Sequence, residues 1–405
     1  MVAGETGVNS NVFECEEDNN DLCTKNNSKT KAYPGIIFLP KHVVILSKTT
    51  RLDYERQKHT QLNRTQFCAL LKRSGWNYKE MKKKHIEQQN YVRAMRLCLE
   101  NHGIEVEVVT RSEYTVEVVA HADAVFSAGG DGTFLVAAEK IRDHRAVVGF
   151  NTDPMGSEGY LCITRKGTQP VGEIIEKLLK GECRWIRRHR IRVTVLKWVE
   201  NNKNNAEFDE ECYEKSDKLR EARLFLQDDC DPEYPLLALN DVFIGESHAS
   251  RASYYDVQID DGPMVRQKSS GMTACTGTGS TSWNYNINRV SEQHVGELLS
   301  IMEGMDLLAV NPTDAITQEI CKRFNEKLIF DPQCTTIAFT VRDPVFNATF
   351  PVGIQRGFAK RIRVRSRCTN AHIVLDSNVS VPFNSGMEVL LEIHESDALC
   401  STVFS

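Results

Sequence analysis

The sequence lacks the features that would place this protein in a membrane, outside the cell or on a nucleic acid. No apolar run approaches the ~18 residues that a membrane-spanning helix needs. The 13 cysteines are odd in number, and no two of them form a Cys-x-x-Cys pair. This pattern argues against a disulfide framework or a zinc site and favours a reducing compartment. The net charge of −5 gives no reason to expect binding to nucleic acid or to a membrane.

Two widespread nucleotide-binding motifs are also absent. The chain contains neither a Walker A loop nor a G-x-G-x-x-G fingerprint, which argues against P-loop kinases and Rossmann dehydrogenases. The 405 residues do include 41% hydrophobic and 26% charged residues, the composition of a soluble globular protein with two or three domains. Residues 1–39 have few large apolar side chains, and we expect them to form a disordered tail.

A glycine-rich stretch is the most informative feature of the first half. The apolar run from Ala124 to Ala128 predicts a buried strand, and Gly129-Gly-Asp-Gly-Thr133 follows it directly. Apolar residues at helical spacing come next, so the glycines lie at a predicted helix N-terminus, where free N–H groups and the helix dipole favour phosphate. Asp131 lies inside this loop, and three roles are open for it. It is a base, a ligand for a phosphate-bound metal, or only a helix cap.

Predicted strands and helices alternate around this stretch. The strands are expected at residues 43–46, 104–109, 124–128 and 146–150, and the helices at 85–100, 131–141 and 171–179. This order predicts an α/β N-terminal domain with a doubly wound, parallel sheet over residues 40–184. Ligands of such sheets bind beyond the carboxyl ends of the strands, where Asp131 and Asn151 would lie. Lys48 follows the first strand, and it either contacts phosphate or belongs to a solvated connection.

The second half of the sequence has a different pattern of apolar and polar residues. From Trp185 onward apolar and polar residues alternate, which predicts a mainly β domain over residues 185–375. Residues 200–235 are acidic and weakly patterned, so we expect a mobile insert there, and residues 284–330 are helical in pattern. We expect the C-terminal segment, residues 376–405, to pack back on the N-terminal domain.

A second glycine-rich element runs from Ser269 to Trp283 and includes Thr276-Gly-Thr-Gly-Ser-Thr281. Its glycines and hydroxyl groups offer many hydrogen-bonding groups with little bulk, which suits the oxygens of sugars and phosphates. The alternative is a flexible loop without a ligand.

Three motifs occur in the order found in NAD kinases: Gly129-Gly-Asp-Gly-Thr133, Leu239-Asn240-Asp241 and Cys275-Thr-Gly-Thr-Gly-Ser-Thr281. Further segments most resemble the animal mitochondrial members of that family: Ser47–Arg51, Asn151–Pro154, Ser157–Gly159, Phe243–Ser247, Ser250–Tyr255 and Asn286–Arg289. The resemblance covers roughly residues 40–405. The ordered series carries the resemblance, because lipid kinases and phosphofructokinases have loops similar to the first motif.

This resemblance implies a fold and a reaction. The fold is NAD kinase/diacylglycerol kinase-like, with an α/β N-terminal domain, a mainly β C-terminal domain with a helical insert, and an active site between them. The reaction transfers the terminal phosphate of ATP, bound with Mg²⁺, to the adenosine ribose 2′-hydroxyl of NAD and yields NADP. No dedicated protein ligands for a metal are expected, since Mg²⁺ on phosphate oxygens needs few.

The resemblance also implies roles for individual residues. Asp131 is the implied base for the ribose hydroxyl. The implied phosphate- and ATP-binding residues are Gly129, Gly130, Gly132, Thr133 and Lys48. The implied NAD-binding residues are Asn151, Tyr160, Asn240, Asp241, Thr276, Gly277, Thr278, Gly279, Ser280, Thr281 and Trp283.

The sequence departs from the family pattern at three of the matched positions. Asp241 stands where the family usually has glutamate, and its side chain is shorter by one methylene. Trp283 stands where many relatives carry tyrosine, and Ser270 where bacterial relatives carry aspartate. The reach of Asp241 to NAD and the contacts of residue 270 with a nucleotide are therefore open.

Location and assembly follow only from the resemblance, which implies a mitochondrial protein and a homodimer. The N-terminal residues are acidic and contain no arginine before Arg51, unlike a presequence, so a cytoplasmic location is the alternative. Two other functions stay open. One is a lipid kinase of the diacylglycerol or sphingosine type, although its Pro-x-Gly-Thr-Gly-Asn segment is absent. The other is an NAD-binding regulatory protein with weak catalysis, although Asp131 is present.

Overall fold

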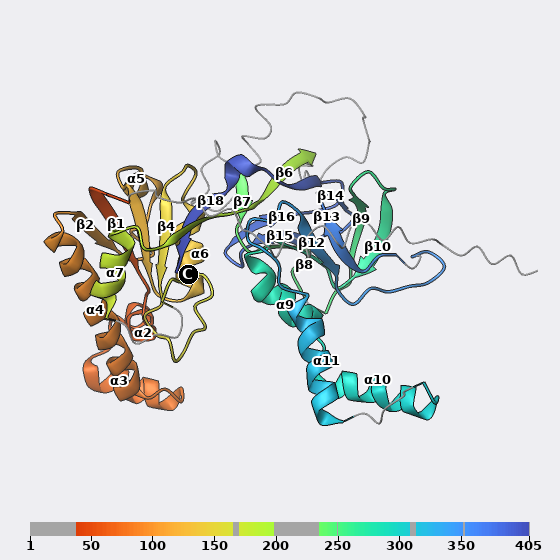
Figure 1. Ribbon diagram of the computed structural model, residues 1–405, viewed down its shortest axis with the longest axis horizontal. Helices are drawn as coiled ribbons and strands as arrows, with labels where there is room; N and C mark the ends of the chain where they lie inside the picture. Colours follow the sequence, from red (N-terminus) through yellow and green to blue (C-terminus); the bar gives the residue numbers. More distant parts are fainter. Residues whose placement is uncertain are drawn as a thin grey trace, which may run out of the picture.

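The computed structural model describes residues 38–164, 170–197, 235–248, 250–307, 313–350 and 353–404. These residues form two domains that lie side by side, an α/β domain on the left of Figure 1 and a β sandwich on the right. Almost all of the predicted tail (1–39) and of the predicted insert (200–235) lies outside the described residues.

The α/β domain is built on one six-stranded sheet. Its strands, in spatial order, are β2 (Glu105–Val109), β1 (His42–Ser47), β3 (Ala124–Ala128), β4 (Ala146–Phe150), β18 (Leu399–Val403) and β5 (Arg184–Arg188). Neighbouring strands run parallel except β5, which is antiparallel to β18. The predicted parallel sheet is therefore confirmed, with one antiparallel edge strand.

Helices cover both faces of this sheet, so the predicted doubly wound arrangement is also confirmed. On one face, α4 (Tyr78–Asn101) and α7 (Val171–Leu179) pack against β1, β3 and β4. On the other face lie α5 (Val116–Ala120) and α6 (Asp131–Glu139). Two further helices, α2 (Arg51–Lys58) and α3 (Arg64–Arg73), precede α4. Both begin with a capping box, in which Thr50 or Asn63 accepts a hydrogen bond from the third helical residue.

The start of the described chain differs from the predicted tail at one buried residue. Phe38 falls within the predicted tail, yet its side chain is only 8% exposed. Its ring lies 6.3 Å from that of Phe126 and 5.2 Å from that of Trp185, centroid to centroid. The tail was predicted from average composition, and an average does not reveal one aromatic side chain that anchors the start of the domain.

The chain crosses between the two domains twice, and one buried arginine joins the two crossings. Arg190 lies just after β5, and its guanidinium is removed from water, which lowers its pKa to about 10. It donates to the backbone oxygen of Asp397, just before β18, and to that of Ile141 at 2.7 Å, beyond the end of α6. The helix that carries Asp131 is thereby fixed to both connections between the domains.

These crossings give domain limits that differ from those read in the sequence. The limit expected at residue 185 falls inside β5, which belongs to the first sheet. Only β18 of the expected segment 376–405 lies in that sheet, whereas β16 (Val379–Pro382) and β17 (Glu388–Ile393) belong to the sandwich. Alternation within a strand does not say which sheet the strand joins, because that depends on residues far away in the chain.

The second domain consists of two antiparallel sheets of six strands each. The first contains β10 (Val265–Ser269), β9 (Ser253–Ile259), β14 (Arg361–Ser366), β17, β6 (Ile191–Lys197) and β7 (Leu236–Ala238). The second contains β13 (Arg356–Ala359), β12 (Ile337–Val341), β11 (Met272–Cys275), β8 (Asp241–Glu246), β15 (Ala371–Leu375) and β16. The predicted mainly β domain is confirmed as a sandwich.

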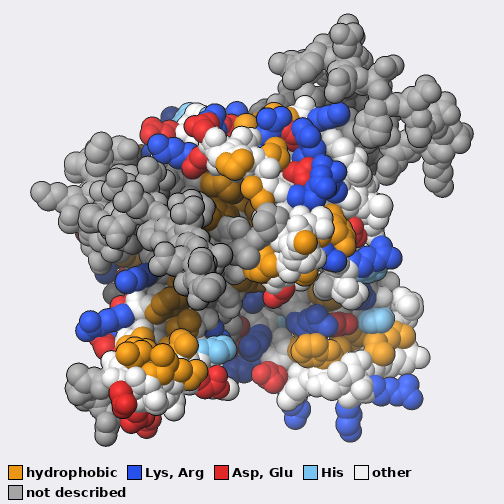
Figure 2. All heavy atoms as spheres, turned by 90° about the vertical axis from the view of Figure 1, so that its right-hand side faces the viewer, with side chains coloured by type: hydrophobic (Ala, Val, Ile, Leu, Met, Phe, Trp, Pro, Cys, Tyr) orange, Lys and Arg blue, Asp and Glu red, His pale blue; other side chains and the backbone are white. Residues whose placement is uncertain are grey.

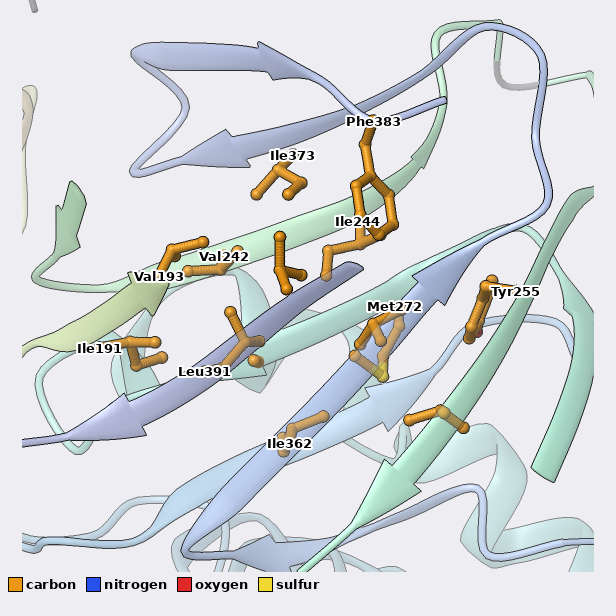
Figure 3. Packing of buried hydrophobic residues seen from close by; sticks show 14 of the residues in the cluster. Ile191, Val193, Val242, Ile244, Tyr255, Met272, Ile362, Ile373, Phe383 and Leu391 are labelled. Atoms are coloured by element: carbon orange, nitrogen blue, oxygen red, sulfur yellow. The ribbon is translucent and has the colours of Figure 1, made fainter. Parts of the chain in front are cut away.

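Apolar side chains from both sheets fill the space between them. Figure 3 shows Ile362 and Leu391 of the first sheet facing Val242, Ile244 and Met272 of the second. All five side chains are at most 1% exposed. Strand period decides which side chains enter this core, since successive residues of a strand point to opposite faces.

The outward face of β14 carries arginines that are paired with acids. Arg363 and Arg365 both form ion pairs with Glu388, and the distance for Arg365 is 2.9 Å. Arg367, the residue after β14, forms an ion pair with Asp256 at 2.6 Å. Figure 2 looks onto the sandwich side of the molecule and shows side chains of both charges intermingled on that side of the molecule. The arginines of β14 are thus largely neutralised by carboxylates of neighbouring strands.

Helices leave the sandwich after the second glycine-rich element. They are the short η1 (Gly279–Thr281) and α9 (Trp283–Asn288), followed by α10 (Glu292–Gly304) and α11 (Asp314–Glu326). In Figure 1, α10 and α11 project below the sandwich, and they are the helical insert predicted over residues 284–330. No helix among the described residues is both long enough and apolar enough to cross a membrane.

Candidate active site

The first glycine-rich loop connects β3 to α6, and there is almost no space around its first two glycines. A Cβ atom added to Gly129 would lie 2.2 Å from Oγ1 of Thr133 and 2.9 Å from Cβ of Lys48. A Cβ on Gly130 would lie 2.6 Å from Oγ of Ser157. Close approach of neighbouring segments, and not an unusual φ angle, therefore requires glycine at position 129, whereas the Ser157 hydroxyl beside Gly130 can rotate away. Backbone N–H groups at the start of α6 remain accessible to a phosphate, because Gly132 is exposed.

Asp131 is the first residue of α6, and its carboxylate binds a neighbouring loop. It accepts hydrogen bonds from the backbone N–H of Tyr160 at 3.1 Å and of Leu161 at 2.8 Å. The N-cap position is Gly130, which makes no side-chain capping bond. Asp131 is thus not the helix cap that the sequence left open, and its half-buried carboxylate retains lone pairs for a ligand.

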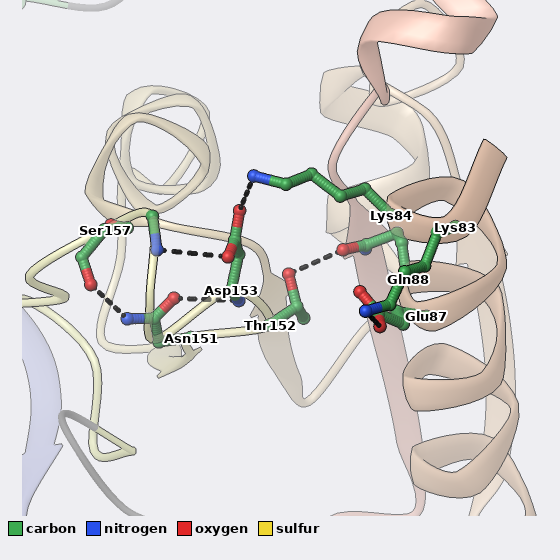
Figure 4. Close-up of polar contacts among 9 residues, drawn as sticks. Lys83, Lys84, Glu87, Gln88, Asn151, Thr152, Asp153 and Ser157 are labelled. Carbon is green, nitrogen blue, oxygen red and sulfur yellow. Dashed lines mark hydrogen bonds and ion pairs between the residues drawn. The ribbon is translucent and has the colours of Figure 1, made fainter. Parts of the chain in front are cut away.

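A buried glutamine, whose bond to Thr152 is drawn in Figure 4, holds together the three strand ends around this loop. Gln88 of α4 donates from Nε2 to Oγ of Ser47 at 3.2 Å and to the backbone oxygen of Ala128 at 2.9 Å. Its Oε1 accepts a hydrogen bond from Oγ1 of Thr152 at 2.5 Å. These partners follow or end β1, β3 and β4, so one side chain fixes the carboxyl edge of the sheet. Sequence reasoning missed Gln88, although it lies four residues before Val92 on the apolar face of its helix.

Replacing Gln88 by Met is expected to lower the free energy of unfolding by about 1–3 kcal/mol, because buried polar groups lose their partners. Methionine keeps the length and helix propensity of glutamine, so the lost hydrogen bonds dominate the change. Urea denaturation of the wild type and the variant measures the difference. Gln89→Met is the matched control, because Gln89 is the exposed neighbour on the same helix. Equal midpoints for the two variants would contradict the role of Gln88.

Asn151 is buried in the structure, whereas the side chain of Tyr160 is exposed. Asn151 is 1% exposed, and its amide is used within its own loop: it donates to the backbone oxygen of Ser157 at 3.0 Å and accepts from Asp153 at 3.1 Å (Figure 4). Tyr160 is 40% exposed. Asn151 therefore shapes the loop, whereas Tyr160 presents its side chain to an opening between the domains.

Lys48 lines a separate cavity of about 310 Å³ at the carboxyl edge of the sheet, together with Arg51, Trp76 and Lys84. Lys84 forms an ion pair with Asp153 at 3.4 Å (Figure 4), and Arg51 lies over the ring of Trp76 at 4.5 Å. Glu80, Glu87 and Asp153 also line this cavity, so its acidic side chains equal its three cationic ones in number, and the lining does not by itself select a phosphorylated ligand.

In the second domain, the two predicted NAD-binding elements pack directly on each other. The backbone N–H of Thr276 donates to the oxygen of Asn240 at 2.9 Å, and its hydroxyl donates to the oxygen of Leu239 at 2.5 Å. A Cβ on Gly279 would lie 2.2 Å from that same oxygen of Asn240, and one on Gly277 would lie 2.0 Å from the backbone oxygen of Asp331. The glycine-rich element is therefore an ordered part of the core, which excludes the flexible loop.

Asn240 and Asp241 are buried, at 8% and 6% exposure, and keep polar capacity for a ligand. Among the described residues, Oδ1 of Asn240 and Oγ1 of Thr278 are buried without a hydrogen-bond partner. Burial, and next the nearby Asp376, raise the pKa of Asp241 to about 7. A carboxyl group in this range both donates and accepts hydrogen bonds near neutral pH, which suits the hydroxyl groups of a ribose.

Elements of both domains meet at a cavity of about 310 Å³ between them. Tyr160 lines it from the α/β domain, and Gly277, Thr278 and Thr281 line it from the sandwich. Arg184 and Arg188 of β5 also line it, and sequence reasoning did not select them. The signal for them was weak, because arginines recur throughout residues 184–192.

The remaining predicted residues lie apart from this cavity. The hydroxyl of Ser280 donates to the backbone oxygen of Gly277 at 2.6 Å and is fully buried, so it stabilises the loop. Trp283 packs on Phe243, with ring centroids 5.4 Å apart, and lines a third cavity of about 870 Å³ beside Arg342 and Asn286. Within the described part of the chain, no three His, Cys, Asp or Glu side chains gather in a way that could hold a metal ion.

Known proteins resemble the chain over most of its length. No family model matches it. It is 38% identical over 375 residues to NAD kinase 2, mitochondrial, of Rattus norvegicus, covering 90% of this chain and 88% of the relative. It is 38% identical over 370 residues to the Homo sapiens protein of the same name, covering 89% of this chain and 84% of the relative.

A solved structure shares the fold. An NAD kinase from Archaeoglobus fulgidus in complex with ATP matches with a TM-score of 0.50 at 16% identity, over 90% of this chain and 93% of that one. The fold and the relatives define the chain as a kinase. It belongs to the NAD kinase family.

Proposed function

We propose that this protein transfers the terminal phosphate of ATP to the adenosine ribose 2′-hydroxyl of NAD and so forms NADP. One observation carries the proposal. Tyr160, whose backbone is bound by Asp131, faces Gly277 and Thr278 across the cavity between the domains. A residue held by the acid of the helix N-terminus and a loop suited to a dinucleotide thus line one cavity, which supports placing the reaction there.

In this reaction the residues divide into three groups. N–H groups of Gly130, Asp131 and Gly132 at the start of α6 bind phosphate oxygens, while that of Thr133 donates to the backbone oxygen of Gly130 at 2.9 Å. Asn240, Asp241 and the loop from Thr276 to Thr281 hold the NAD. Asp131 accepts the proton of the 2′-hydroxyl while the ribose 2′-oxygen forms a bond to the γ-phosphorus of ATP. The bond between that phosphorus and the β–γ bridging oxygen breaks, and ADP leaves.

Mg²⁺ is part of the proposal as the ion that accompanies ATP. It prefers oxygen ligands, and the carboxylate of Asp131 and the hydroxyl of Thr133 are the side-chain oxygens next to the phosphate-binding glycines. Bound there, it would neutralise charge on the phosphates during transfer. Phosphate oxygens and water would complete its coordination.

The test is to incubate the purified protein with NAD, ATP and Mg²⁺ and to measure NADP with an NADP-specific dehydrogenase. We expect NADP to accumulate with time and with enzyme concentration, and to require ATP. Phosphorylation of diacylglycerol or sphingosine without NADP would support a lipid kinase instead. Binding of NAD without product would support a regulatory protein. Either result overturns the proposal.

Location and assembly complete the proposal. The names of the rat and human relatives support a mitochondrial protein. Expression of the full chain with a C-terminal tag, followed by cell fractionation, decides between mitochondria and cytoplasm. We also infer a homodimer, which sedimentation velocity of the purified protein tests: a species near 46 kDa would contradict it, since one chain has a mass of 45.9 kDa.

A further inference from the structure

One tight turn outside the motifs contacts both halves of the candidate active site. It joins β15 to β16 and contains Asp376, Ser377 and Asn378. Asp376 and Ser377 have φ angles of 49° and 58°, a left-handed conformation that residues other than glycine adopt infrequently. Such backbone persists where surrounding contacts stabilise it, and the contacts of this turn are unusually specific.

The first contact is made by the carboxylate of Asp376, which binds the Leu239–Asp241 backbone. Its Oδ2 accepts a hydrogen bond from the N–H of Leu239 at 2.7 Å. Its Oδ1 accepts from the N–H of Asn240 at 2.7 Å and from that of Asp241 at 3.1 Å. In return, the N–H of Asp376 donates to the oxygen of Asp241 at 3.0 Å. One carboxylate therefore accepts hydrogen bonds from three consecutive backbone N–H groups.

The opposite side of the same loop is held by Thr276, which binds the backbone oxygens of Leu239 and Asn240. The loop is thus fixed between Asp376 and the glycine-rich element. Its remaining freedom lies in the side chains of Asn240 and Asp241, and the unpartnered Oδ1 of Asn240 is left for a ligand. Movement of this backbone would shift both side chains together.

The second contact is made by the amide of Asn378, which reaches the α/β domain. It accepts a hydrogen bond from Arg111, in the segment after β2, and donates one to Glu139. Glu139 is the last residue of α6, the helix that begins at Asp131. The turn therefore bridges the sandwich and the helix that carries the proposed base.

We propose that the turn Asp376–Asn378 positions the acceptor nucleotide, with Asp376 fixing the Asn240–Asp241 backbone and Asn378 aligning that loop with α6. This rests on the function proposed above, because it assigns Asn240 and Asp241 to NAD. Asp376 is a positioning residue in this scheme, since it acts through the loop and touches no substrate.

The electrostatics agree with this division of roles. Removal of the Asp376 carboxylate from water raises its pKa to about 6, although the three N–H groups lower it and Glu139 raises it further. Burial raises the pKa of Asp241 as well. An ionised carboxylate is the better acceptor for three N–H groups, so the hydrogen bonds from Leu239, Asn240 and Asp241 favour the ionised form of Asp376.

Asp376→Asn is the main test, because the amide replaces one acceptor oxygen with a donor at nearly unchanged volume. We expect KM for NAD to rise about tenfold, with kcat and KM for ATP changed by about twofold or less, since the loop binds only NAD. Loss of folded protein alone would lower kcat and leave both KM values unchanged. Hydrogen–deuterium exchange of the peptide containing Leu239–Asp241 should accelerate, because these amides lose their acceptor.

Asp260→Asn is the matched control. Asp260 lies in the turn between β9 and β10 and also has a φ of 49°. Its Oδ1 accepts hydrogen bonds from the backbone N–H groups of Lys360 at 2.7 Å and Arg361 at 2.9 Å. We expect this variant to retain the wild-type KM for NAD. The same rise in both variants would show a general effect of loosening a turn and would overturn the proposal.

Asn378→Ala tests the alignment with α6. We expect kcat to fall about tenfold with little change in exchange at Leu239–Asp241, because a small misplacement of reacting groups slows transfer strongly. Unchanged kcat would remove Asn378 from the proposal, and unchanged KM for NAD in Asp376→Asn would remove Asp376. If wild-type protein forms no NADP, the proposed function fails instead. The exchange experiment then still shows whether Asp376 holds the loop, as it needs no activity.

Discussion

Asp131→Asn is expected to lower kcat by at least ~100-fold, the lower end of general-base effects, with little change in KM for NAD. Asparagine has the shape of aspartate and keeps one oxygen to accept the N–H of Tyr160 or Leu161. It does not take a proton from a hydroxyl group at neutral pH. Steady-state rates of NADP formation measure kcat, and NAD titration monitored by calorimetry measures binding.

The control for this variant is Asp123→Asn. The carboxylate of Asp123 likewise accepts two backbone N–H groups, from Lys41 at 2.7 Å and His42 at 3.0 Å, but these lie at the start of β1. We expect near-wild-type turnover there. If Asp131→Asn also kept near-normal turnover, Asp131 would be a loop anchor only, and the base would have to be sought elsewhere.

Gly279→Ala is expected to lower kcat/KM for NAD by about 100-fold, because the added methyl group displaces the backbone that holds Asn240. The new Cβ would lie 2.2 Å from the backbone oxygen of Asn240, and backbone yields less than the end of a flexible side chain. Overpacking of this kind also lowers the free energy of unfolding by about 1–3 kcal/mol. Kinetics at varied NAD and thermal unfolding measure the two effects.

Gly296→Ala provides the matched comparison within the same domain. Gly296 lies in α10, and a Cβ there would meet no atom within 4 Å. Alanine should stabilise this helix by about 1 kcal/mol and leave kcat/KM unchanged. A Gly279→Ala enzyme with wild-type kinetics would show that the two loops move apart easily, against the tight packing described above.

Local pattern was enough to predict much of the architecture. The apolar run Ala124–Ala128, followed by glycines and a helical pattern, correctly predicted β3, the turn and the start of α6. The helical pattern of residues 171–179 correctly predicted α7, which packs against the sheet. These predictions succeed because strand and helix periods depend on residues a few positions apart. The polar insert expected at 200–235 stays a prediction, since it lies almost entirely outside the described residues.

The connecting residues of the candidate site could not be predicted in the same way. Gln88 looked like an ordinary helix residue, yet it bonds to Ser47 and Thr152, 41 and 64 positions away. Asp376 carries no motif of its own, and its partner Asn240 is 136 positions away. Hydrogen bonds between such distant residues exist only after the strands are in register, so no local window of sequence contains them.

The sequence alone determined the kinds of groups that this protein uses: glycines before a helix for phosphate, one acid among them, and a second loop of glycines and hydroxyl groups. Only the tertiary structure decided how they meet. In the folded protein, Tyr160 lines the same cavity as Gly277 and Thr278. The amide of Asn151 donates a hydrogen bond within its own loop, and Gly279 packs against the backbone of Asn240. Chemical character belongs to each side chain, whereas proximity depends on packing two domains whose chain crosses between them twice.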